Sequence, residues 1–230
     1  MSIDPFESSE SLANWVGRQL DAKTISAVAN WRMLEYWLQV ELYRSAMLGE
    51  AGPWRHLGDY EQPYYTESPR SGSKYKTKWV DLVFAEPNLM NPERIVWVEL
   101  KDVGRSSDRI EANLKGIGQD LAALYQLNPT KTKELWTDPP PHVVDRGRFD
   151  EWGRYSGGIT GARHLISQVV IIPRALAKDV GDERIVDIWL RAFEARVNGP
   201  QITQDLDIHR FDGERFATFG TVSPLPDIIG

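Results

Sequence analysis

The sequence predicts an α/β or α+β fold in three layers, with a central mixed β-sheet flanked by helices. Two segments, 78–84 and 95–101, are rich in β-branched and aromatic residues and are apolar on both faces, as strands buried inside a sheet are. Segments with apolar residues at helical spacing precede and follow this pair. Buried strands between such segments favour a sheet that is covered by helices on both faces.

Two helices are predicted before these strands. Residues 8–20 and about 30–48 both carry apolar residues at helical spacing. In the second helix, Glu35 and Gln39 fall on the polar side of a helical wheel, whereas Glu41 falls inside the apolar arc. We therefore expect Glu41 to face inward.

The remaining predicted elements are strands and helices in alternation, separated by turns rich in Gly and Pro. They are an edge strand at 60–66, a helix capped by Ser107 or Asp108 with Glu111 completing a capping box, a loop-rich segment at 136–163, a strand at 166–172, a helix from Asp182, and a C-terminal hairpin at 205–220 that turns at Asp212-Gly213. We expect a single domain over residues 1–230, with its core at about 30–200.

Composition excludes several kinds of chemistry. The chain of 230 residues contains no cysteine, so it has no disulfides, no thiolate nucleophile and no zinc–thiolate site. The N-terminus is not a signal peptide and no apolar run is long enough to cross a membrane, so we expect a cytoplasmic protein. The net charge of −6 and the pI of about 5.3 are not typical of a nucleic-acid binder.

The local charge before the first central strand differs from this average. Four basic side chains lie there, interleaved with Tyr75 and Trp79: Arg70, Lys74, Lys76 and Lys78. This cluster can contact phosphates, and it is our predicted nucleic-acid-binding segment. The alternative interpretation is a solvated basic loop that ends in a strand.

The two central strands carry charges that a buried strand does not need. Asp81 lies in the first strand, and Glu99 and Lys101 point to the same face at the end of the second. The short connection between the strands suits an antiparallel pair, which would let Asp81 reach that face. Buried charges cost several kcal/mol unless they are paired, hydrogen-bonded or metal-bound, so we expect one cluster of two acids and an ammonium group.

Asp81 followed eighteen residues later by Glu99-Leu100-Lys101, after a helix with an inward glutamate, resembles the PD-(D/E)XK nuclease superfamily. The resemblance implies the restriction-endonuclease-like fold, with Asp81 and Glu99 as ligands of Mg²⁺ or Mn²⁺ and Lys101 assisting the attacking water. It also implies a helix glutamate as a further metal ligand, which we assign to Glu41, with Glu35 as the alternative. Val80 stands where the motif has proline.

The same resemblance implies that the helix after the Glu-Leu-Lys strand supplies another polar group. Lys115 and Gln119 lie off the apolar face of that helix, and Gln119 is our preferred candidate. Independently of any family, a few carboxylates are the hard oxygen ligands that suit Mg²⁺ or Mn²⁺, and such ions assist displacement at phosphorus.

These observations lead to the hypothesis of a metal-dependent nuclease that hydrolyses phosphodiester bonds in nucleic acid, with DNA as the expected substrate. Two alternatives remain open. The charges can be a structural salt bridge, or the domain can be a catalytically inactive nuclease-like module that binds nucleic acid or a protein partner. Because the chain is acidic, a homodimer or a partner subunit could supply the basic surface that DNA requires.

Overall fold

The computed structural model describes residues 4–22, 34–57, 61–67, 75–87, 90–104, 106–144, 158–197 and 206–226. The described chain forms a central six-stranded sheet in the order β1-β4-β5-β6-β8-β7. Its strands are β1 (Arg55–His56), β4 (Leu82–Glu86), β5 (Arg94–Asp102), β6 (Arg163–Pro173), β7 (Ile208–Asp212) and β8 (Phe216–Pro224). Only the β5–β6 pair is parallel among these, so the sheet is mixed, as predicted.

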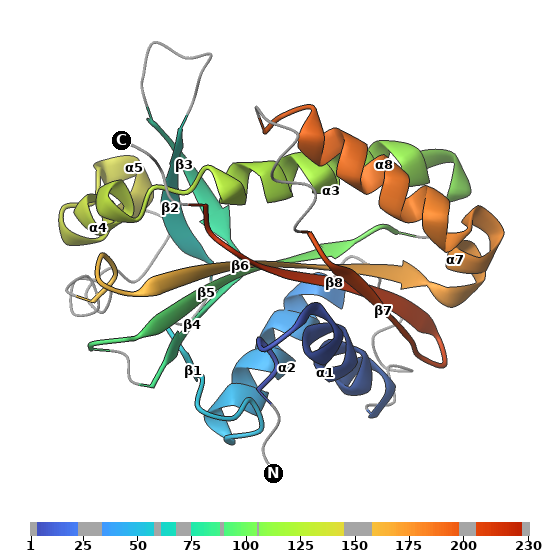
Figure 1. Ribbon diagram of the computed structural model, residues 1–230, viewed down its shortest axis with the longest axis horizontal. Helices are drawn as coiled ribbons and strands as arrows, with labels where there is room; N and C mark the ends of the chain where they lie inside the picture. The colour runs from blue at the N-terminus through green and yellow to red at the C-terminus, as the bar shows by residue number, and fades with distance from the viewer. Residues whose placement is uncertain are drawn as a thin grey trace.

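Helices cover both faces of this sheet (Figure 1). On one face lie α1 (Ser9–Ala22) and α2 (Leu34–Met47), which share an apolar core with alternate residues of β4, β5 and β6. On the other face lie α3 (Ile110–Tyr125), α7 (Arg174–Val180) and α8 (Asp182–Glu194), which share a second core with the intervening residues of the same strands. The predicted three-layer mixed α/β architecture is therefore confirmed.

A second, two-stranded sheet stands beside the central one. It consists of β2 (Gln62–Glu67) and β3 (Tyr75–Val80), paired antiparallel, with α4 (Pro129–Thr137) against β2 and α5 (Pro141–Val144) following. Figure 1 shows this hairpin on the same side of the central sheet as α3. Asn128 caps α4 by accepting a hydrogen bond from the Lys131 backbone N–H. Pro129 occupies the first turn, where the N–H group that proline lacks would have no partner within the helix.

Two predictions are wrong, one for the first central strand and one for the start of α3. The segment 78–84 is not one strand, because β3 ends at Val80 and β4 begins at Leu82 in the other sheet. The predicted capping box is also absent from this part of the structure. A short 3-10 helix, η3 (Ser107–Arg109), leads into α3 without a side-chain cap, and Glu111 instead pairs with Lys115.

The C-terminal hairpin is more central than its sequence suggested. It does turn after Asp212, but β8 continues to Pro224 and pairs with β6 along its length. Leu12 in α1 and Phe219 in β8 are both buried, so the core extends beyond the predicted 30–200 at both ends. The segment 136–163, predicted as loop, contains the end of α4 and all of α5, and 145–157 lie outside the described residues.

In the described part of the chain, every helix is too short or too polar to span a bilayer.

Candidate active site

The candidate site begins where the chain passes from one sheet to the other. The pairing of β4 with β5 ends at Leu82 and Val98, although β6 continues to pair with β5 as far as Asp102. The backbone N–H of Leu100 donates instead to the Asp81 carboxylate, with 2.6 Å between N and Oδ2. A side chain thus takes the position of a strand partner, which leaves the edge of β5 beside Glu99 and Lys101 open to other groups.

The second oxygen of Asp81 is also held. Gln39 in α2 donates from Nε2 to Oδ1 at 2.6 Å, and both residues are buried. With both oxygens hydrogen-bonded, the carboxylate is fixed in one orientation. Burial raises the pKa of Asp81 to about 7, and the nearby charge of Lys101 only partly offsets this. Gln39 was missed by the sequence interpretation, which placed it on the solvent side of its helix.

Glu99 and Lys101 lie on the same face of β5, as the strand period predicts, and they form an ion pair. Lys101 Nζ is 2.5 Å from Glu99 Oε1. Burial raises the pKa of Glu99 to about 8, and the neighbouring charge of Asp81 contributes in the same direction. Burial works to lower the pKa of Lys101, but the carboxylates of Glu99 and Asp81 together outweigh it and raise that pKa. The ammonium group therefore stays charged.

The helix acid at this site is Glu35, the alternative candidate. Its Oε1 lies 3.5 Å from Lys101 Nζ, and burial raises its pKa above the ordinary value. Successive residues of an α-helix turn by about 100°, so Gln39 lies about 40° from Glu35 on α2 while Glu41 lies about 120° away. Glu41 is on another flank, where it pairs with Arg44 at 3.9 Å. The prediction of Glu41 as the site glutamate is therefore corrected to Glu35.

The helix α3 contributes a different residue from the one predicted. Gln119 is exposed and accepts a hydrogen bond from Arg196 at 3.3 Å, on the flank of α3 that adjoins α8. Lys115, the other candidate, is exposed and pairs with Glu111. Asp120 lies on the side of the site instead, 3.6 Å from Lys78, and its charge makes a small contribution to the raised pKa of Glu99. Asp120 is one residue beyond Gln119, which places it about 100° further round α3, on the opposite flank of the helix.

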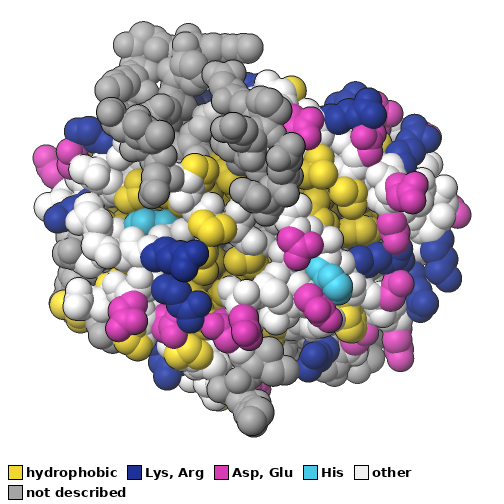
Figure 2. Space-filling view, viewed as in Figure 1, with side chains coloured by type: hydrophobic (Ala, Val, Ile, Leu, Met, Phe, Trp, Pro, Cys, Tyr) yellow, Lys and Arg dark blue, Asp and Glu magenta, His cyan; other side chains and the backbone are white. Residues whose placement is uncertain are grey.

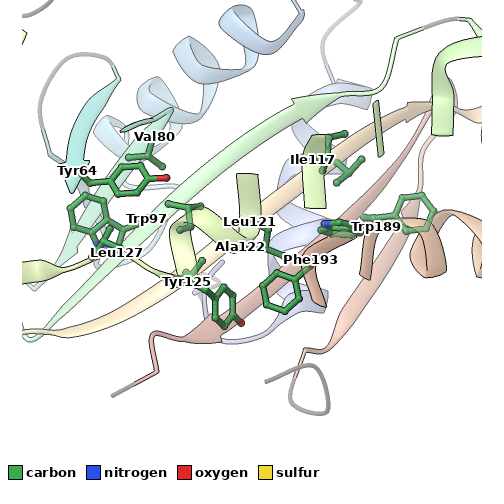
Figure 3. Packing of buried hydrophobic residues seen from close by; sticks show 14 of the residues in the cluster. Tyr64, Val80, Trp97, Ile117, Leu121, Ala122, Tyr125, Leu127, Trp189 and Phe193 are labelled. Atoms are coloured by element: carbon green, nitrogen blue, oxygen red, sulfur yellow. The ribbon is translucent and has the colours of Figure 1, made fainter. Parts of the chain in front are cut away.

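The β2–β3 hairpin forms another wall. Tyr64 in β2 packs between Val80 and Trp97 (Figure 3), and burial, followed by the charge of Glu99, raises the pKa of its hydroxyl. Its cross-strand neighbour Lys78 lies 3.6 Å from Asp120 Oδ1. Of the other predicted nucleic-acid-binding residues, Lys76 is exposed on the same face of β3, whereas Arg70 and Lys74 lie outside the described residues.

The donor set suits a hard divalent cation. Within the described ranges, no group of three His, Cys, Asp or Glu side chains is spaced to hold an ion. Mg²⁺, however, is commonly held by one or two carboxylates together with water and substrate phosphate oxygens. Asp81 and Glu99 provide two buried carboxyl groups, and burial is the main cause that raises the pKa of each. A bound cation would supply positive charge, so the residues present fit Mg²⁺ or Mn²⁺.

Comparison of the chain with models of protein families, with curated proteins and with solved structures finds no match.

Proposed function

We propose that this chain is a metal-dependent nuclease of the PD-(D/E)XK type, with a restriction-endonuclease-like fold, that hydrolyses phosphodiester bonds in DNA. The observation that supports this best is the convergence of Asp81, Glu99 and Lys101 at the open edge of β5. Two buried acids and an ammonium group meet there, although Asp81 lies in the link between β3 and β4 and the other two lie on β5. Such a cluster is expensive to bury for structural purposes alone.

Each residue has a distinct task in the proposed reaction. Asp81 and Glu99 would hold Mg²⁺ or Mn²⁺, which when bound supplies a nucleophilic hydroxide near neutral pH and neutralises charge at phosphorus. Gln39 and the Leu100 N–H orient the Asp81 carboxylate. Lys101 stays charged and can hold the attacking water or stabilise the oxygens of the phosphoryl group.

Glu35 fixes the position of Lys101. The ammonium group lies between Glu99 and Glu35, at 2.5 and 3.5 Å, so it is restrained from two sides. Restraint of this kind keeps a catalytic group in a productive position without a rearrangement during the reaction. We therefore assign Glu35 as a positioning residue.

The second candidate function is a catalytically inactive module of the same architecture that binds DNA or a protein partner. One observation favours it: Lys101 already neutralises Glu99, and the described residues include no three-ligand metal group. In that case the cluster would be a structural ion pair, and DNA binding would need no metal.

Purified protein incubated with linear, supercoiled and single-stranded DNA in Mg²⁺ or Mn²⁺ separates the two functions. We expect cleavage by the wild type and its loss in Lys101→Ala and Asp81→Ala. Lys115→Ala is the matched control, because this lysine also pairs with a glutamate but is exposed on α3. Intact DNA in both metals, combined with tight metal-independent binding, would support the inactive module instead.

A further inference from the structure

The groups of the candidate site differ in how far solvent reaches them. Asp81 and Glu99, which we call the floor, are each 6% exposed. The side chain of Lys101 is 23% exposed. The side chains of Glu35, Lys78 and Asp120, which we call the rim, are 36%, 36% and 38% exposed. The rim residues come from α2, β3 and α3, so three separate elements surround the floor.

This arrangement restricts the shape of a substrate. A phosphodiester must approach a cation held by two floor groups that solvent barely reaches. Duplex DNA is a stiff rod with a persistence length of about 50 nm, and its phosphates lie on a broad, regular surface. A single strand is narrow and flexible, so one of its phosphates can pass the rim while the rest of the strand bends away. The burial of the floor therefore favours single-stranded DNA.

The charges of the site also favour single-stranded DNA. The floor, the rim and Lys101 together contain four carboxyl groups and two ammonium groups, those of Lys78 and Lys101. Duplex DNA carries about one negative charge per 1.7 Å of axis, which is twice the linear density of one strand. An acidic site therefore repels a duplex more strongly than a single strand.

The described part of the surface in Figure 2 has charges of both signs. Among the described residues on that face, Lys and Arg side chains lie near Asp and Glu and do not gather into a continuous basic area. The chain as a whole has a net charge of −6. A long duplex gains little from such a surface, whereas a single strand needs only a few contacts close to the reacting phosphate.

Lys78 is the rim residue placed to make such a contact. It stands opposite Tyr64 across the hairpin, and Tyr64 is close enough to Glu99 for the charge of Glu99 to raise the pKa of its hydroxyl. The pair between Lys78 and Asp120 is long, at 3.6 Å, and both side chains are partly exposed. An exposed pair of this kind contributes little, so a phosphate can replace Asp120 as the partner of Lys78.

We propose that the substrate is single-stranded DNA, either free or as the unpaired tail of a duplex, and that Lys78 binds a phosphate next to the one that is cleaved. This inference rests on the proposed nuclease function. It adds to that function the strand form of the substrate and a residue that recognises it.

The experiment compares four internally labelled DNAs of one sequence in Mg²⁺ and in Mn²⁺: a single strand, a blunt duplex, a duplex with a single-stranded tail, and a covalently closed duplex circle. We expect the single strand and the tail to be cut about tenfold faster than the paired DNA, or more. Equal or faster cutting of blunt and closed duplexes overturns the inference but leaves the nuclease function standing. No cutting of any DNA overturns the nuclease function itself.

Binding provides a readout that does not need activity. Glu99→Gln keeps the shape of the floor and removes one charge, and its affinity for the single strand and for the blunt duplex can be compared by fluorescence anisotropy. We expect tighter binding of the single strand, and weaker binding when Lys78→Ala is added. Lys131→Ala is the matched control, because Lys131 also pairs with an acid but lies on α4. Equal affinity for both DNAs, or an equal loss in both lysine variants, overturns the assignment.

Discussion

The Asp81 carboxylate accepts the Leu100 N–H at 2.6 Å, at the point where β4 stops pairing with β5. If β4 had begun before Leu82 and continued this pairing, its backbone would have used this donor and occupied the edge of β5 beside Glu99. Because a carboxylate uses it instead, the backbone of β5 stays satisfied while its edge remains open. Asp81 therefore follows the end of β3, hydrogen-bonds to the backbone of β5, and supplies a carboxyl group to the site.

Gln39→Ala tests the support of Asp81 from α2. The change removes the donor to Asp81 Oδ1 and lets the carboxylate rotate. Loss of a partner that orients a metal ligand commonly lowers activity or metal affinity by about 10- to 100-fold, and we expect a decrease of that order in DNA cleavage. The measurement is kcat and KM on the best substrate in Mg²⁺.

Gln119→Ala is the matched control for this measurement, since Gln119 is exposed and contacts Arg196. We expect cleavage by this variant to stay within about twofold of wild type, as is usual for a surface change. A large loss in Gln119→Ala together with none in Gln39→Ala would restore the assignment made from the sequence.

The two helix glutamates give a second test. Glu35→Gln removes a charge beside Lys101, which loosens the ammonium group and should lower cleavage by about tenfold. Glu41→Gln changes a residue that pairs with Arg44 on another flank of α2, so we expect cleavage close to wild type. Circular dichroism of both variants would show whether any loss of activity comes from loss of fold. Loss confined to Glu41→Gln would contradict the geometry.

The stability of the metal-free protein should fall as pH rises from about 4, the ordinary pKa of a carboxyl group, to about 8. The pKa of Asp81 is raised to about 7 and that of Glu99 to about 8, so the folded protein keeps protons that the unfolded chain has already released. Stability then decreases as pH rises, until both folded-state pKa values are passed. The two shifts together correspond to several kcal/mol, as an order of magnitude.

His164 has the opposite effect but in a different window. Burial lowers its pKa to about 4, so its contribution is lost as pH falls below about 6.5 and is complete above that value. Thermal unfolding in EDTA at pH 6.5, 7 and 8 therefore isolates the two carboxylates. We expect the decrease of the melting temperature with pH to be smaller in Glu99→Gln and to persist in Glu183→Gln, a control in which the changed residue is exposed. At pH 8, Mg²⁺ or Mn²⁺ should raise the melting temperature of wild type more than that of Glu99→Gln.

The sequence was sufficient for the layers and for the charged strand residues. Asp81, Glu99 and Lys101 were identifiable because charges inside apolar, β-branched segments are costly and therefore conspicuous. The site residues on helices were harder to predict from the sequence. The apolar arc of α2 has polar residues at both of its edges, and periodicity alone does not say which edge meets the open end of β5. The switch of sheets at Asp81 was also hidden, because each half of the segment 78–84 has the composition of a strand.

The two glycines of α3 provide a test of the fold that is independent of the site. A methyl group at Gly118 would lie 2.3 Å from the backbone carbonyl oxygen of Trp189 in α8, whereas one at Gly116 would meet nothing within 4 Å. Gly118→Ala should therefore force the two helices apart and destabilise the protein by about 1–3 kcal/mol, or more if the helices cannot shift. Gly116→Ala should stabilise it by up to about 1 kcal/mol, because alanine is the better helix former. Urea unfolding of both variants measures the difference directly, and equal effects would contradict the close packing of α3 on α8.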